Sequence, residues 1–170
     1  MRSSIGIDVA AAPDVVFVLA RDVTTWERLL PHYVRSRIDR REPDGRLVCS
    51  FVAVRAWLPL VGLGIPVAWR SRTWSDEDAR TLRFVHLAGA TKGMDVTWRI
   101  EACGPGCRVT IVHDFERALP LLGAERFPRL VDRLFTRPIA GRTLATFKAI
   151  AEAVADGARS GLPAATNPPT

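Results

Sequence analysis

Apolar and polar residues alternate along several stretches of this chain with the two-residue period of a half-buried β-strand. The clearest stretch covers residues 94–100 and is followed, after the turn signal Gly104-Pro105-Gly106, by a second at 108–115. One face of the first stretch carries four large apolar side chains, Met94, Val96, Trp98 and Ile100. We therefore predict an antiparallel hairpin with one apolar face, large enough to line a cavity.

The same alternation predicts further strands on both sides of a helical region. Their ranges are 3–9, 34–41, 46–57, 65–74 and 81–88. Turn-forming residues separate the later strands, and no helical pattern lies between them. Consecutive strands without intervening helices favour an antiparallel meander over a parallel sheet.

Helical patterns occupy the two ends of the chain. Pro13 suits the first position of a helix that runs to Ala20. A second short helix is expected from Thr24, because Thr24 and Glu27 have the spacing of a capping box. Near the C-terminus a kink or a new helix start is expected at Pro138. An apolar stripe with helical spacing follows it, at Ala140, Leu144, Phe147, Ala151 and Val154.

These elements predict an α+β fold. A curved antiparallel sheet of about seven strands wraps around a long C-terminal helix, two short helices follow the first strand, and a cavity lies between sheet and helix. Residues 1–156 are expected to form one domain, and residues 157–170 a disordered tail. Small residues on the terminal helix either leave volume beside the sheet or only allow close packing: Ala140, Gly141, Ala145 and Ala149.

Composition narrows the classes of partner. The chain has 170 residues, 48% of them hydrophobic, so it can bury a core without a disulfide or a metal. Its net charge of +6, almost entirely from arginine, favours an acidic partner. The arginines are scattered, and no basic run is interleaved with aromatic residues, so nucleic-acid binding is not expected.

The sequence favours neither membrane insertion, nor disulfide bonds, nor a metal or cofactor site. The apolar run 57–69 is interrupted by Pro59 and Pro66 and is shorter than the ~20 residues of a membrane span, so stable insertion is not expected. That run is expected to form a covered loop or a pocket lip. The odd number of cysteines (Cys49, Cys103, Cys107) and the lack of a signal peptide favour reduced thiols in a cytoplasm. No zinc-binding or dinucleotide-binding spacing is present, so we expect neither metal nor cofactor.

Several motifs carry a resemblance to a known superfamily. They are Ala12-Pro13, Val16-Phe17, Asp22-Val23-Thr24-Thr25-Trp26, Leu30-Pro31-His32-Tyr33, Arg80-Thr81-Leu82-Arg83, Gly93-Met94-Asp95-Val96-Thr97-Trp98, His113-Asp114-Phe115, Arg142-Thr143-Leu144, Phe147-Lys148 and Ala151-Glu152. On these motifs residues 3–156 resemble the START-like (SRPBCC, helix-grip) superfamily, specifically its polyketide cyclase/dehydrase branch.

The resemblance implies a bacterial, cytoplasmic aromatase/cyclase. Such an enzyme takes a poly-β-ketone tethered to an acyl carrier protein, folds it in a hydrophobic cavity, and promotes regiospecific aldol cyclisation with loss of water. It uses no cofactor. A monomer and a homodimer are both compatible with the sequence. The alternative function is a non-catalytic carrier of a hydrophobic, quinone- or lipid-like ligand, resembling other members of the same superfamily.

The resemblance also implies which residues meet the substrate. We expect the pocket to include Trp26, Leu30, Trp69, Ser71, Thr73, Met94, Trp98 and Thr143. The best-known aromatase/cyclases have an arginine proton donor where this chain has Thr73. Either another group serves as donor, or the chemistry differs, or the protein binds without catalysing.

Four candidates for the chemistry each have a plainer alternative. Tyr33 either donates a hydrogen bond to a substrate carbonyl or packs in the core. His86 and His113 either move a proton from a substrate methylene or are buried histidines bonded to a neighbouring strand. Arg55, if it points inward, could replace the missing donor or bind a phosphopantetheine phosphate; if outward, it is a solvated edge residue. His32 is expected at the cavity rim or in solvent.

Overall fold

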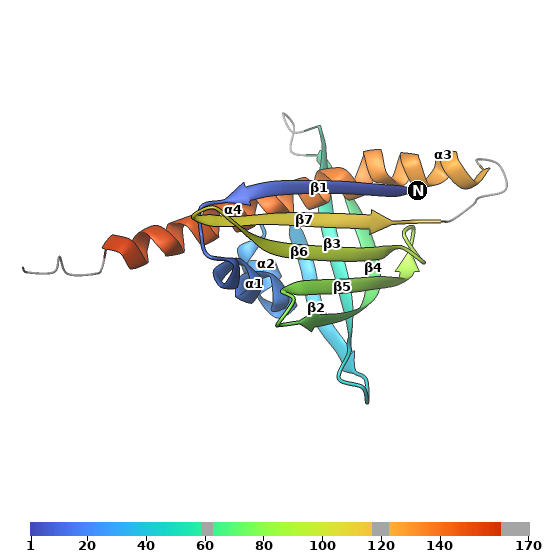
Figure 1. The fold of residues 1–170 in the computed structure, drawn as a ribbon. Helices are drawn as coiled ribbons and strands as arrows, with labels where there is room; N and C mark the ends of the chain where they lie inside the picture. Colours follow the sequence, from blue (N-terminus) through green and yellow to red (C-terminus); the bar gives the residue numbers. More distant parts are fainter. Residues whose placement is uncertain (59–62, 117–122, 161–170) are drawn as a thin grey trace, which may run out of the picture.

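In the part of the chain that the structure describes, a seven-stranded sheet forms the body of the molecule (Figure 1). The computed structural model describes residues 1–58, 63–116 and 123–160. The strand order is β1-β7-β6-β5-β4-β3-β2, and every neighbouring pair is antiparallel, as predicted. The strands are β1 (Arg2–Val9), β2 (Tyr33–Arg41), β3 (Leu47–Leu58), β4 (Leu63–Asp76), β5 (Thr81–Gly89), β6 (Asp95–Cys103) and β7 (Gly106–Asp114). The tip of the apolar run, residues 59–62, lies outside the described residues.

The predicted hairpin is confirmed as β6 and β7. Trp98 of β6 pairs with Ile111 of β7, and the turn contains Gly104, whose φ of 56° favours glycine. The apolar side chains that share one face are all buried: Met94, Val96, Trp98 and Ile100. The two-residue alternation in the sequence therefore correctly predicted that this face lies in the interior.

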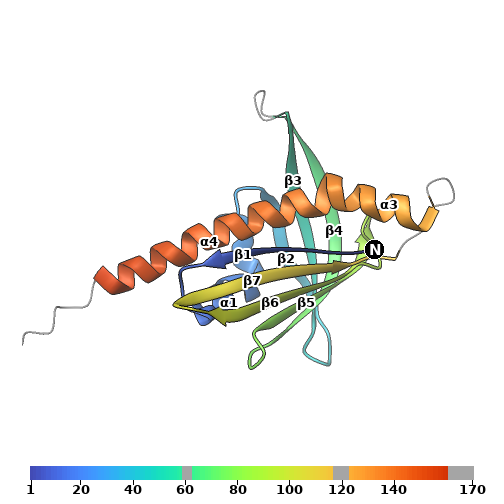
Figure 2. The ribbon, with the colours of Figure 1, turned by 45° about the horizontal axis from the view of Figure 1, so that its top comes forward.

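The C-terminal helical segments run across the concave face of the sheet (Figure 2). They are α3 (Gly123–Val131), a π-helical turn η3 (Asp132–Thr136) and α4 (Arg137–Ser160). Their interior face buries Ile139, Ala140, Thr143, Leu144, Phe147 and Ala151. Among the described helices, none is both long enough and apolar enough to cross a membrane.

Three details of the predicted helix were wrong. Val154 is 51% exposed, because α4 extends past the edge of the sheet (Figure 2). Ala145 and Ala149 are also exposed, so neither leaves volume beside the sheet. The helix continues to Ser160, past the predicted end at 156, where the Ser160 hydroxyl donates to the Asp156 carbonyl at 2.9 Å. Residues 161–170 lie outside the described residues, so disorder there stays a prediction.

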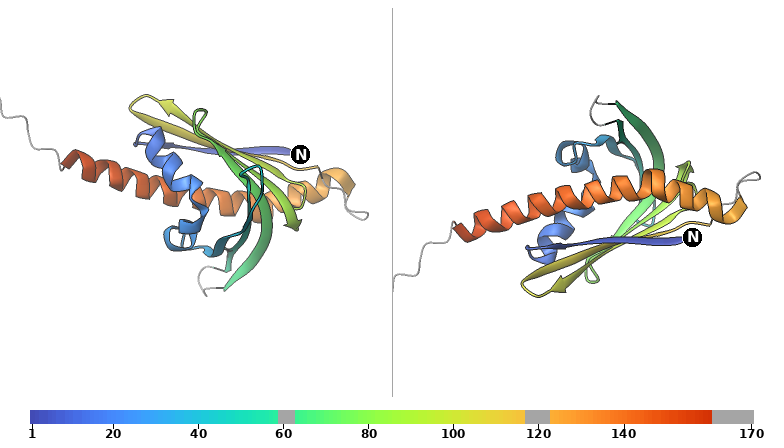
Figure 3. Two further views of the ribbon diagram at one scale, coloured as in Figure 1. Left: turned by 90° about the horizontal axis from the view of Figure 1, so that it is seen from below. Right: turned by 90° about the horizontal axis from the view of Figure 1, so that it is seen from above.

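Short helices lie beside α4 at one end of the sheet (Figure 3). Helix α1 (Pro13–Arg21) starts at the proline, as predicted; η1 (Val23–Thr25) and α2 (Trp26–Leu29) follow. The predicted capping box was wrong. Asp22 caps η1 by accepting from the Thr24 amide at 3.0 Å, and Glu27 accepts from the Ser36 amide on β2 instead.

Trp26 joins these short helices to the sheet and to α4. Its indole Nε1 donates to the Ala20 carbonyl at 3.2 Å. Its ring lies within 5.2–5.9 Å, between ring centroids, of Tyr33, Phe51, Phe84, Trp98 and Phe147. Aromatic pairs in such tilted and edge-to-face arrangements contribute about 0.5–1.5 kcal/mol each beyond their burial. This cluster closes one end of the space between sheet and helix.

Candidate functional site: an apolar cavity between the sheet and the C-terminal helix

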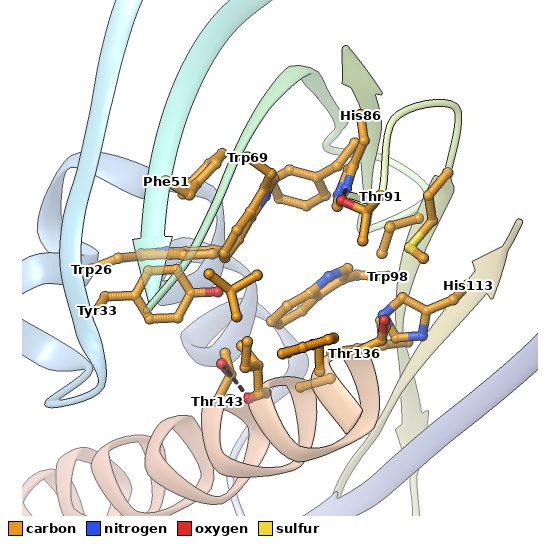
Figure 4. A pocket seen from close by; sticks show the side chains of 18 residues that line it. Trp26, Tyr33, Phe51, Trp69, His86, Thr91, Trp98, His113, Thr136 and Thr143 are labelled. Atoms are coloured by element: carbon orange, nitrogen blue, oxygen red, sulfur yellow. Dashed lines mark hydrogen bonds between the residues drawn. The ribbon is translucent and has the colours of Figure 1, made fainter. Parts of the chain in front are cut away.

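A cavity of about 80 Å³ lies between the concave face of the sheet and the η3–α4 segment (Figure 4). One water needs only ~10–15 Å³ of such space, so the cavity can hold several waters or part of a ligand. Most of its lining is apolar: Trp26, Phe51, Val67, Trp69, Phe84, Met94, Val96, Trp98, Ile111, Phe135, Ile139 and Ala140. The polar side chains are Tyr33, His86, Thr91, His113, Thr136 and Thr143. A mostly apolar lining with a few convergent polar groups is typical of a small-molecule site.

Tyr33 stands at the start of β2, with its hydroxyl directed into the cavity (Figure 4). Its ring packs edge-to-face on Trp26 and on His32, with centroids 5.2 and 5.0 Å away. Burial raises the pKa of the Tyr33 hydroxyl, and the neighbouring Thr143 side chain offsets this only in part. Tyr33 therefore keeps its proton at neutral pH and can donate it in a hydrogen bond.

His86 extends into the cavity from β5 (Figure 4). Its ring stacks on Trp69 with centroids 6.0 Å apart, and its Nδ1 lies 2.6 Å from Thr91 Oγ1. Thr91 belongs to the turn after β5, where the Met94 amide donates to the Thr91 carbonyl at 2.9 Å. Burial, followed by the charge of His113, lowers the pKa of His86 to about 3. The imidazole is therefore neutral at pH 7.

His113 enters the same cavity from β7. Burial is the main cause that lowers its pKa to about 4; Asp132 opposes this shift and Arg137 adds to it. Asp132 is itself buried, and it accepts from the Ser3 hydroxyl at 2.7 Å and pairs with Arg137 at 3.4 Å. With Tyr33 protonated and both histidines neutral, these polar groups carry no charge at neutral pH. Such a lining suits an uncharged ligand.

Eight of the residues predicted for the site line the cavity: Trp26, Tyr33, Trp69, His86, Met94, Trp98, His113 and Thr143. The structure thus brings together side chains from α2, β2, β4, β5, β6, β7 and α4 or the turns beside them. Their roles in binding or chemistry stay predictions.

Four predicted residues do not line the cavity, which corrects that part of the prediction. Ser71 and Thr73 are buried on the inward face of β4, but beyond Trp69 along the strand. Leu30 is fully buried in the hydrophobic core and does not reach the cavity. Arg55 pairs with Ile65, one inward position beyond the Ala53–Val67 pair. A strand's period gives the face of a side chain, but not whether the cavity reaches that far along the strand.

His32 was also misplaced. It is 2% exposed rather than at a rim, and its Nε2 lies 2.9 Å from Thr143 Oγ1. His32 lies in the turn directly before β2, and this turn packs against α4. The helix therefore covers the imidazole.

The sequence reasoning missed Phe135 and Thr136, which the π-helical turn directs to the cavity. In this turn the Arg137 amide bonds to the Asp132 carbonyl, five residues back, and Pro138 has no amide hydrogen to continue an α-helical pattern. Pro138 was the available signal, although it predicted only a kink or restart. Thr91 lies in a turn, where no period marks the inward side.

The described residues contain no group of three or more His, Cys, Asp or Glu side chains that could hold a metal ion. The cysteines are free thiols; Cys49 and Cys107 are buried and Cys103 is exposed. Burial raises the pKa of the Cys49 thiol to about 12, which makes it unreactive at neutral pH.

Solved structures with the same fold include aromatase/cyclases. The Zhui aromatase/cyclase from Streptomyces sp. R1128 superposes with a TM-score of 0.71 at 21% identity, covering 89% of this chain and 93% of that one. The protein TTHA0849 from Thermus thermophilus gives 0.66 at 22% identity, with coverages of 92% and 99%. The di-domain aromatase/cyclase BexL from the BE-7585A biosynthetic pathway gives 0.64 at 24% identity; 88% of this chain matches 45% of that protein.

Sequence comparison identifies the family more directly. No curated protein sequence matches the chain significantly. A family model described as polyketide cyclase / dehydrase and lipid transport matches residues 2–152, nearly the whole described chain. This confirms the resemblance that the sequence motifs indicated. The chain belongs to the polyketide cyclase/dehydrase and lipid-transport family.

Proposed function

We propose that this protein is a cofactor-independent aromatase/cyclase. It binds a poly-β-ketone carried by an acyl carrier protein, and promotes regiospecific aldol cyclisation and dehydration in the cavity. The observation that carries the proposal is the convergence of Tyr33, His86 and His113 from separate strands into one apolar cavity. The family match and the aromatase/cyclase neighbours support the reaction class.

The reaction needs shape, a hydrogen-bond donor and a proton acceptor. A proton leaves a methylene between two carbonyls, the resulting enolate attacks another carbonyl carbon, and the new alkoxide takes up a proton. Loss of water then gives the conjugated ring. Holding the chain in one folded geometry lowers the barrier to closure. One general acid or base adds typically ~10²–10⁴-fold.

Tyr33 is the proposed donor to the carbonyl whose oxygen becomes negative. In a cavity with little water, a fixed hydroxyl stabilises that developing charge more than it would in solution. No arginine or lysine lines the cavity in the described part of the chain, in keeping with Thr73 at the usual arginine position. The proposed chemistry therefore relies on uncharged donors.

His86 is the proposed proton acceptor, with His113 as the second candidate. Both are neutral at pH 7, so each has a ring nitrogen able to accept. A base with a pKa near 3 is weak, but an enolate forming beside the ring favours the imidazolium and raises that pKa during the step. The tryptophans Trp26, Trp69 and Trp98 offer flat surfaces to the conjugated chain.

The positive net charge supports the proposed delivery by an acyl carrier protein, because an acidic partner is attracted over distance. Electrostatic attraction between the two proteins raises the rate of their encounter but does not by itself select the partner.

The test is reconstitution with a minimal polyketide synthase and its carrier protein, followed by product analysis. The wild type should direct the nascent chain into one cyclised aromatic product in place of the spontaneous shunt products. Tyr33→Phe should lower that conversion at least about tenfold while the protein stays folded, because only the donor is lost. An unchanged shunt profile with wild type would contradict the proposal. If ligand still binds tightly, that result would favour the hydrophobic-ligand carrier, which the missing cationic donor also favours.

A further inference from the structure

The buried residue His32 determines what the Thr143 hydroxyl can offer to a ligand. His32 Nε2 lies 2.9 Å from Thr143 Oγ1, whereas His32 Nδ1 is buried without a hydrogen-bond partner among the described residues. A buried N–H without a partner is rarer in proteins than an unpaired acceptor. The ring hydrogen therefore sits on Nε2, and Nδ1 carries the lone pair. Burial lowers the pKa of His32 to about 4, so at neutral pH the ring has only this one N–H.

Thr143 is consequently left with nothing to donate. Its hydroxyl has one hydrogen, which goes to the Ile139 carbonyl at 2.9 Å, and it accepts the hydrogen of His32 Nε2. A hydroxyl oxygen has two lone pairs, so one remains. Thr143 lines the cavity from α4, next to Ile139 and Ala140 of the same helix. Toward a ligand, Thr143 can act only as an acceptor.

Tyr33 supplies the complementary group. Its hydroxyl keeps its proton, and the Thr143 side chain is close enough to offset part of the rise in its pKa. Both side chains face the same part of the cavity (Figure 4). A ligand oxygen placed there meets one donor and one acceptor. A ketone or an ether oxygen can use only the donor, whereas the hydroxyl of an enol or a phenol uses both.

We propose that Tyr33 and Thr143 form a subsite for a ligand hydroxyl, that of an enol or a phenol, and that His32 is the positioning residue that keeps Thr143 an acceptor. The inference rests on the proposed use of the cavity as the ligand site, and it deepens the proposed function. The enol form of a 1,3-dicarbonyl is the neutral form of the enolate that attacks in the aldol step, and this subsite stabilises the enol relative to the diketone.

The test compares 2-naphthol with 2-methoxynaphthalene by calorimetric titration. Both oxygens accept, but only naphthol donates. Wild type should bind naphthol roughly tenfold more tightly, the size of one buried hydrogen bond. Thr143→Val should abolish this preference by weakening naphthol alone, and Thr143→Ser should keep it. Thr146→Val is the matched control, because the Thr146 hydroxyl donates to the Arg142 carbonyl at 2.9 Å in the same way but outside the cavity.

Each outcome separates the proposals. A preference for naphthol that persists in Thr143→Val overturns the subsite. Failure of both probes to bind contradicts the cavity as a ligand site and overturns the proposed function with it. The predicted preference without any change of polyketide products contradicts the enzyme alone. Nitrogen-15 spectra, assigned with His32→Gln, should show His32 protonated at Nε2; protonation at Nδ1 would overturn its positioning role.

Discussion

Burial controls the chemistry of single residues in this cavity. It raises the pKa of Tyr33 and lowers those of His86 and His113, so that all three are uncharged at neutral pH. In each case desolvation is the largest cause. An uncharged, hydrogen-bonding lining favours a ligand that is polar at a few oxygens and apolar elsewhere. A carboxylate ligand would lose its hydration without gaining a cationic partner.

The buried histidines also predict how stability depends on pH. The folded-state pKa values are about 4, 3 and 4 for His32, His86 and His113, below the ordinary value of 6.5. Because the unfolded chain binds these protons more readily, the stabilisation is complete above pH 6.5 and is lost as pH falls toward the folded-state values. Each histidine should cost up to about 2 kcal/mol between pH 7 and pH 5.

Urea unfolding at pH 7 and pH 5 measures this effect. We expect a clearly lower free energy of unfolding at pH 5, and a smaller difference in His86→Gln, which removes one of the titrating groups. Equal free energies of unfolding at the two pH values would show that the histidines are not held neutral by burial.

At the scale of elements, the strands were predicted well and the ends of the helices less well. The period of two in β6 placed Trp98 inward because alternation is a local property of the chain. The extent of the cavity along β4 depends on how distant helices close the sheet, and no local pattern reports that. This is why Trp69 lines the cavity while Ser71 and Thr73, on the same face, do not.

The segment from η1 to α2 gives a second example. The spacing of Thr24 and Glu27 fits a capping box, but Asp22 precedes both and caps an extra 3₁₀ turn first. Several neighbouring polar residues can cap a helix at this point, and contacts with other elements determine which of them does. The Glu27 carboxylate is engaged by the Ser36 amide of β2, a partner that sequence spacing does not reveal.

Asp22→Ala should therefore destabilise the protein by about 1 kcal/mol, the usual cost of losing a helix cap. The Asp22 carboxylate accepts from both the amide and the hydroxyl of Thr24, at 3.0 and 2.6 Å. Thermal unfolding should show a Tm lower by about 2–4 °C for a chain of this size. Asp22→Asn should retain most of the stability, since its amide oxygen still accepts. A Tm for Asp22→Ala equal to that of wild type would contradict the capping role.

For the molecule as a whole, the sheet, α1–α2 and the C-terminal helix together leave a space that no single element encloses. Its lining comes from six strands or their turns and from helical segments on the concave side. Empty apolar space costs stability, because the lining atoms lack contacts on one side. Such a space is expected where a ligand must enter. Filling it should therefore weaken ligand binding without lowering the stability of the fold.

Ala140→Leu tests this. Ala140 is 8% exposed and lines the cavity, so a leucine there occupies the space without meeting solvent. We expect naphthol binding to fall at least about tenfold while Tm is unchanged or higher. Ala145→Leu, on the exposed face of the same helix, should leave binding unchanged. Undiminished binding by Ala140→Leu would place the ligand site elsewhere.

A crystal structure of the protein with a bound phenolic polyketide tests the role of the cavity most directly. The ligand rings should lie between the sheet and α4, against Trp69 and Trp98, with one hydroxyl within hydrogen-bond distance of both Tyr33 and Thr143. A ligand bound outside this cavity, or a cavity that stays closed at saturating ligand, would contradict the role assigned to these residues.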